Sequence, residues 1–174
     1  SITTNDIADM WIHEGFCTYA EALYVECLYG YDQMLDYVNN QKRFIKNKSS
    51  IVGHYHVNNQ GSGDMYQKAS VMLHTLRTLI ENDELWFSII REISDKYKYT
   101  TVDAHEIIDY IMQRTGYDLQ DFFSQYLNYK DIPEFQYKLV REGRNTTLIY
   151  RWEATPRFDM PLLINSGNED FWIY

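Results

Sequence analysis

Apolar residues recur every three or four positions along most of this chain, a spacing typical of amphipathic helices. The pattern predicts a first helix from about Asp9 or His13 to Tyr29, and further helices over about Tyr31–Asn47, Asp64–Ile80, Asn82–Lys96, Thr101–Arg114 and Asp118–Tyr129. The predicted buried residues of the second helix are Tyr31, Met34, Leu35, Val38, Phe44 and Ile45. Gly30 and Gly116 follow two of these segments, where glycine often ends a helix. A short polar, β-prone segment, Ser1–Asn5, precedes the first helix. Residues 1–130 are therefore predicted to be mainly helical.

The pattern changes after Pro133, where apolar and polar residues begin to alternate. Two alternating runs, which contain Phe135, Tyr137, Leu139 and then Leu148, Tyr150, Trp152, flank a turn at residues 143–145. This arrangement predicts an antiparallel hairpin. Met160–Asn165 and Phe171–Tyr174 are further strand candidates. We expect residues 131–174 to form the start of a small β module.

The first helix carries two stripes of side chains. Phe16, Ala20, Leu23 and Cys27 form an apolar stripe, and Glu14, Thr18, Glu21 and Val25 form an acidic one. The apolar stripe is predicted to face the core. Cys17 and Cys27 lie ~15 Å apart along the helix axis, which is too far for a disulfide, so both are predicted to be core thiols.

Charge and composition narrow the choice of partners. The chain has 25 acidic and 16 basic residues and a net charge of −9. This balance argues against nucleic acid, because phosphate binding needs a basic surface. No apolar run reaches the ~20 residues that span a membrane. No signal peptide begins the sequence, and we assign no compartment.

Two segments that contain histidine are candidate metal or substrate sites. His54 and His56 lie in a loop predicted for residues 48–64, where they are either solvated or line a substrate cleft. His105 begins a sequence that differs by one residue from the zinc motif His-Glu-x-x-His, with Asp109 in place of the second histidine. Such near matches are common on helices, and we expect an exposed helix face here.

The segment Trp11–Glu21 has the sequence WIHEGFCTYAE. It resembles the Trp-Leu-Asn-Glu-Gly-Phe-x-x-Tyr-x-Glu segment of the zinc aminopeptidases, a family of gluzincin metallopeptidases that includes aminopeptidase N. The resemblance implies that Glu14 is the third zinc ligand. Glu21 is either a carboxylate that orients the site or a solvated side chain. The fold implied is the helical second half of a thermolysin-like catalytic domain, followed by antiparallel strands of a partial C-terminal β module.

The family's first two zinc ligands are the histidines of a His-Glu-x-x-His motif. They lie further before the glutamate than the thirteen residues that precede Glu14 here. A catalytic zinc takes three protein ligands and leaves a fourth position for water. We therefore expect this chain to be a fragment that is inactive by itself.

A second segment, Gly63–Leu73, has the sequence GDMYQKASVML. It resembles the Tyr-x-Lys-Gly-x-x-Val-Leu segment of the same family, which implies that Tyr66 donates a hydrogen bond to the oxyanion of the reaction. Tyr66 also continues the apolar stripe of the predicted third helix, so we expect it to point inward. Ala69 replaces the family's usual glycine and His13 its usual asparagine. His13 is a weak candidate for lining the cleft.

Three interpretations remain open. The first is a fragment of a zinc aminopeptidase, which removes N-terminal residues from peptide substrates. The second is a catalytically silent member of the family that acts as a scaffold or binding module, because His13 and Ala69 depart from the family pattern. The third is a helical interaction domain in which both motifs arise by chance.

Overall fold

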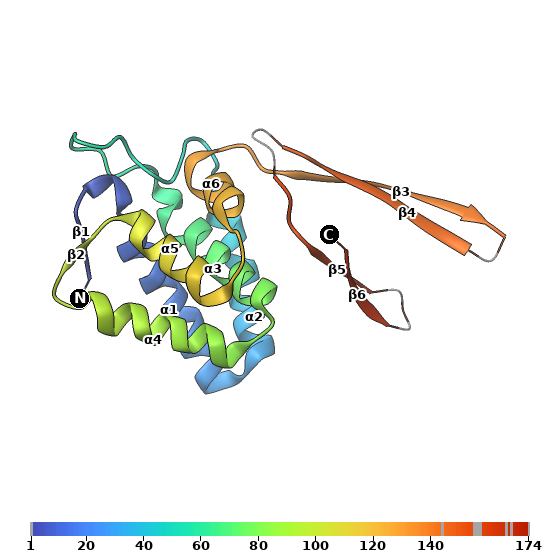
Figure 1. Ribbon diagram of the computed structural model, residues 1–174, viewed down its shortest axis with the longest axis horizontal. Helices are drawn as coiled ribbons and strands as arrows, with labels where there is room; N and C mark the ends of the chain where they lie inside the picture. The colour runs from blue at the N-terminus through green and yellow to red at the C-terminus, as the bar shows by residue number, and fades with distance from the viewer. Residues whose placement is uncertain (1, 144, 155–157, 166, 168, 174) are drawn as a thin grey trace. The chain divides into compact units, whose positions relative to one another are not determined.

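The computed structural model describes residues 2–143, 145–154, 158–165, 167 and 169–173. It divides the chain into two compact units, residues 1–130 and residues 131–174 (Figure 1). Ser1, Arg144 and Tyr174, which belong to a predicted strand, turn and strand, lie outside the described residues. Each unit is considered by itself below.

The first unit is built from six helices in its described residues. They are α1 (Trp11–Tyr29), α2 (Tyr31–Gln41), α3 (Gln67–Ile80), α4 (Asp83–Tyr97), α5 (Ala104–Thr115) and α6 (Gln120–Asn128). Short 3-10 turns cover Ile7–Asp9 (η1), Lys42–Phe44 (η2) and Gly63–Met65 (η3). The predicted mainly helical fold is confirmed. Among the described residues, no helix is both long enough and apolar enough to cross a membrane.

Two predicted helix boundaries are wrong. The second helix ends at Gln41 instead of continuing to Asn47. Thr101 and Val102 form a short strand, β2, which pairs in parallel with β1 (Thr3–Thr4) instead of starting α5. Asp103 follows this strand and begins α5 through a capping box with Glu106, so local capping chemistry sets the helix start.

α3 lies at the centre of the helical unit and contacts α1, α2, α4 and α6 (Figure 1). Its predicted stripe is confirmed at Ala69, Met72, Leu73, Leu76 and Ile80, all of which are buried. Leu79 is only half-buried. Burying one large apolar side chain contributes about 1.5–3 kcal/mol, so this stripe is a main source of stability.

The predicted buried stripe of α1 is wrong. Ala20 and Cys27 are exposed, as is Cys17. The face of α1 that packs inward instead carries Trp11, Ile12, Gly15, Thr18, Tyr19 and Ala22. Tyr19 fixes this orientation, because its hydroxyl accepts a hydrogen bond of 3.2 Å from the indole Nε1 of Trp86 in α4.

The residues at the two ends of the predicted second helix also depart from expectation. Tyr31 and Phe44 were expected in the core, and both are exposed. Met34 and Val38 in the middle of α2 are buried as predicted. The helix ends before Phe44, so the regular helical stripe does not extend to that residue.

The second unit consists of two antiparallel strand pairs in its described residues. β3 (Glu134–Glu142) pairs with β4 (Asn145–Glu153), and β5 (Leu162–Asn165) pairs with β6 (Asp170–Ile173). The register of the first pair sets Phe135 opposite Trp152 and Tyr137 opposite Tyr150. The predicted hairpin and the two later strands are confirmed.

Candidate active site

Glu14 lies in the first turn of α1 and is half-buried. Within the part of the chain that the structure describes, its carboxylate forms no hydrogen bond or ion pair. A partly buried carboxylate normally finds a partner, because removing charge from water costs free energy. Glu14 is therefore available to bind a group from outside these residues.

Gly15, the residue after Glu14, marks the closest approach of α1 to α3. A Cβ atom at this position would lie 2.6 Å from the Cβ of Ala69 and 3.4 Å from the carbonyl oxygen of Met65. The N-terminal ends of α1 and α3 are thus in direct contact. Glu14 lies one residue before this contact on α1, and Tyr66 lies three residues before it on the α3 side, so one packing contact brings the two motif residues to the same region.

Tyr66 lies between η3 and α3 and is 39% exposed. The expectation that it points inward is wrong. Met65, four residues before Ala69, takes the buried position one turn earlier, and Tyr66 lies between the 3-10 turn and α3 with its side chain exposed. Within the described residues the Tyr66 hydroxyl has no hydrogen-bond partner. An exposed phenol with a free hydroxyl can donate a hydrogen bond to a ligand.

The two departures from the family pattern have structural roles. The Nε2 atom of His13 accepts a hydrogen bond of 3.0 Å from the backbone N–H of Thr4, which attaches β1 to α1. The Cβ of Ala69 occupies the space that Gly15 leaves by having no side chain. His13 is therefore used inside the fold in this structure.

Glu21 lies two helical turns beyond Glu14, about 10 Å along the axis. Its carboxylate accepts a hydrogen bond of 2.8 Å from the Tyr37 hydroxyl of α2. This hydrogen bond to a carboxylate is the main reason why the pKa of Tyr37 is raised. The structure places Glu21 at the contact between α1 and α2 and not beside Glu14.

The loop between η2 and η3 is held by acidic side chains whose role the sequence patterns did not predict. The Tyr55 hydroxyl donates a hydrogen bond of 2.7 Å to Asp9, which also accepts one of 3.2 Å from the N–H of Ala104. Burial raises the pKa of Asp9. The N–H of His56 donates a 2.8 Å hydrogen bond to Asp6. His54 and His56 are both exposed, and they remain candidates for contacting a substrate.

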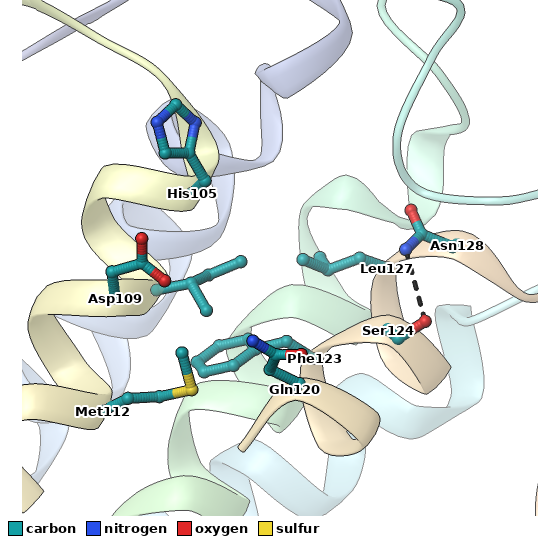
Figure 2. Close-up of a pocket in the computed structure, with 9 residues that line it drawn as sticks. His105, Asp109, Met112, Gln120, Phe123, Ser124, Leu127 and Asn128 are labelled. Atoms are coloured by element: carbon teal, nitrogen blue, oxygen red, sulfur yellow. Dashed lines mark hydrogen bonds between the residues drawn. The ribbon is translucent and has the colours of Figure 1, made fainter. Parts of the chain in front are cut away.

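The second histidine motif lies at a separate pocket of about 210 Å³ between α5 and α6. Figure 2 shows Met112 of α5 and Phe123 and Leu127 of α6 around its apolar floor, with His105 and Asp109 one turn apart on α5. Both polar residues are exposed. Among the described residues, no three His, Cys, Asp or Glu side chains are grouped so that they could hold a metal ion.

The fold of the helical unit is that of the C-terminal helical part of a metallopeptidase catalytic domain. A family profile described as "Peptidase family M1 domain" matches residues 1–126, and the chain belongs to this family. Membership confirms the predicted metallopeptidase relationship. No curated protein matches the sequence.

Among solved structures, the chain is similar to a mutant M1 zinc metallopeptidase from Deinococcus radiodurans that is bound to a Tyr-Ser-Ala substrate. The two share 18% sequence identity with a TM-score of 0.62, and the match covers 76% of this chain and 30% of that one. The chain therefore spans less than a third of that enzyme's length. At 18% sequence identity, this structural similarity establishes the fold.

Proposed function

We propose that the protein to which this chain belongs is a zinc aminopeptidase in which Glu14 is one metal ligand and Tyr66 an oxyanion donor. The observation that carries this proposal is the contact between Gly15 and Ala69. It joins the beginnings of α1 and α3, beside which lie a carboxylate and a phenol that have no partner among the described residues.

The residues of this chain fit one part of a zinc site. A half-buried carboxylate oxygen is a suitable zinc ligand, and the described residues supply no group of three ligands, so we assign the remaining ligands to residues outside them. Zinc, when bound, would polarise a peptide carbonyl and acidify a water molecule. Tyr66 would donate its hydroxyl proton in a hydrogen bond to the oxygen on which negative charge develops, and it would remain a neutral phenol.

The alternative function, a scaffold without catalysis, rested on the two departures at His13 and Ala69. Both side chains have partners inside the fold, so neither departure by itself indicates a loss of activity. This favours the enzyme. The sequence that precedes Ser1 in the parent protein decides between them, because an intact His-Glu-x-x-His supports the enzyme and a broken one supports the scaffold.

The test is an assay of the parent protein with the peptide Tyr-Ser-Ala, in which free tyrosine is measured with and without a chelator. We expect tyrosine release that chelation abolishes and added zinc restores. The 174-residue chain alone is expected to release none. No release by the zinc-loaded parent would support the scaffold, and turnover by the isolated chain at equal metal concentration would contradict the ligand assignment.

A further inference from the structure

A second pocket, of about 400 Å³, borders the segment that carries Tyr66. Its lining includes Phe44, Lys46 and Lys48 on one side and Ser62 and Gln67 on the other. Gln67 directly follows Tyr66 in the chain. A ligand in this pocket would therefore lie beside the segment that carries the proposed oxyanion donor.

The walls of this pocket are held together by Asp64. Its buried carboxylate accepts hydrogen bonds from the backbone N–H groups of Lys46 and Asn47, at 2.9 and 2.7 Å. Both carboxylate oxygens are thus used by the backbone. The side chains of Lys46 and Lys48 project from a segment that is fixed to the turn before Tyr66.

The pocket is basic in a protein that is otherwise acidic. Although the net charge is −9, the segment from residue 42 to residue 48 contains four basic residues and no acidic one. Lys46 and Lys48 are exposed, and neither ammonium group forms an ion pair with a described residue. The one carboxylate in the lining, that of Asp64, is buried and already accepts two backbone hydrogen bonds. The exposed charges of the pocket are therefore positive, and they attract ligands of negative charge.

We propose that this pocket binds a carboxylate of the peptide substrate, with Lys46 and Lys48 as the residues that determine this preference; the inference rests on the proposed function. The carboxylate is either the C-terminus of a short peptide or an acidic side chain. The exposed ring of Phe44 supplies apolar surface for the adjoining carbon atoms. The hydroxyl of Ser62 in the wall is buried and has no hydrogen-bond partner among the described residues.

Two matched peptide pairs separate the sources of the carboxylate. Ala-Ala-Ala is compared with its C-terminal amide, and Ala-Glu-Ala amide with Ala-Gln-Ala amide. Exposed charge pairs contribute about 0.2–1 kcal/mol each, so we expect the parent protein to have a roughly fivefold higher kcat/KM for the charged member of at least one pair. The difference should lie mainly in KM, because binding away from the reacting bond is uniform.

The double variant Lys46→Gln/Lys48→Gln should abolish this preference, and Lys46→Arg/Lys48→Arg should keep it. Lys130→Gln removes one positive charge from an exposed position outside the pocket and should leave the preference unchanged. Raising the salt concentration should weaken the preference of the unmodified protein.

Failure of this inference differs from failure of the proposed function. Turnover of all four peptides without a charge preference, or a preference that survives in the double glutamine variant, would overturn the inference alone. If the parent turns over none of them, calorimetric binding of Ala-Ala-Ala decides. If Ala-Ala-Ala binds about fivefold more tightly than its amide, and the double glutamine variant loses this difference, a carboxylate site is supported. Equal binding of the two peptides overturns it.

Discussion

Two regions of the helical unit carry sequences that resemble zinc-peptidase motifs, and the structure treats them differently. At the junction of α1 and α3, Glu14 belongs to one helix and Tyr66 precedes the other, and the contact of Gly15 with Ala69 joins the two segments. At the α5–α6 pocket, His105 and the carboxylate one turn later come from a single helix. His105 and Asp109 have the i, i+4 spacing of two metal ligands on one helix. Among the described residues, however, no third potential ligand is grouped with them.

The difference teaches that convergence of elements, and not spacing along one helix, distinguishes a candidate site. A single helix places two side chains on the same face at almost any i, i+4 pair. Bringing a carboxylate and a phenol from separate helices to one region requires a specific close packing of backbones. That packing uses a glycine, because only a residue without Cβ permits a helix approach this close.

The largest expected effect comes from Glu14→Gln in the zinc-loaded parent protein. Removing a group that only supports a zinc ligand costs about 10- to 100-fold in affinity, so we expect more than about 100-fold for the ligand itself. The measurement is zinc content after dialysis against a graded chelator. The matched control is Asp109→Asn at the α5–α6 pocket, which should bind zinc normally, and an equal loss in both variants would contradict the comparison.

Tyr66→Phe should lower the kcat of the parent protein about 10²- to 10³-fold, as expected when an oxyanion donor is removed. KM should change little, because the hydrogen bond forms mainly in the transition state. Steady-state kinetics on Tyr-Ser-Ala measure both constants. Tyr99→Phe removes the hydroxyl from a side chain that is 90% exposed and should leave kcat unchanged. A normal kcat in the Tyr66 variant would remove it from the site.

Gly15→Ala tests the contact that brings the two motif residues together. The added Cβ would meet the Cβ of Ala69 at 2.6 Å. Overpacking of this kind costs about 1–3 kcal/mol, measured as the free energy of unfolding in urea. Ala69→Gly in the same chain should recover part of the loss and give a coupling energy in a double-mutant cycle. Additive effects would show that the two residues do not pack together.

The smallest expected effect is a pH dependence of the free energy of unfolding, which we assign to His74 and not to a residue of the proposed site. Burial, followed by the nearby charge of Arg77, lowers the pKa of His74. The unfolded chain takes up a proton near the ordinary histidine value while the folded chain does not, so stability is present above about pH 6.5 and falls as the pH decreases, by at most about 1.4 kcal/mol per pH unit.

His74→Gln should flatten this dependence between pH 7 and pH 5.5, as measured by urea unfolding at a series of pH values. His54→Gln removes an exposed histidine and serves as the control. An identical pH dependence in the unmodified chain and the His74 variant would contradict the assignment of the effect to this buried ring.

The sequence predicted the six helices, the hairpin and the α3 core because those features depend on local periodicity. It did not predict which face of α1 is buried, since apolar residues surround that helix and the choice depends on Trp86 and α3. Asp9 was also missed as an anchor. Its partner Ala104 is 95 residues away, and no local pattern indicates such a contact.

For the site, the motif resemblance singled out Glu14 and Tyr66, but the orientation of Tyr66 was wrong. The prediction assumed a regular helix from Asp64, whereas a 3-10 turn, η3, precedes α3 and Met65 is buried in place of Tyr66. Short 3-10 turns follow from how the segment packs, so periodicity alone could not have given this result. The basic pocket likewise depends on the fold, because Asp64 joins segments that are separated in the sequence.

The most direct test of the central claim is anomalous diffraction at the zinc edge from crystals of the zinc-loaded parent protein. The account predicts a zinc peak about 2.0–2.2 Å from a carboxylate oxygen of Glu14, with the Tyr66 hydroxyl facing the same cavity. A zinc ion bound elsewhere, with Glu14 directed into solvent, would contradict it.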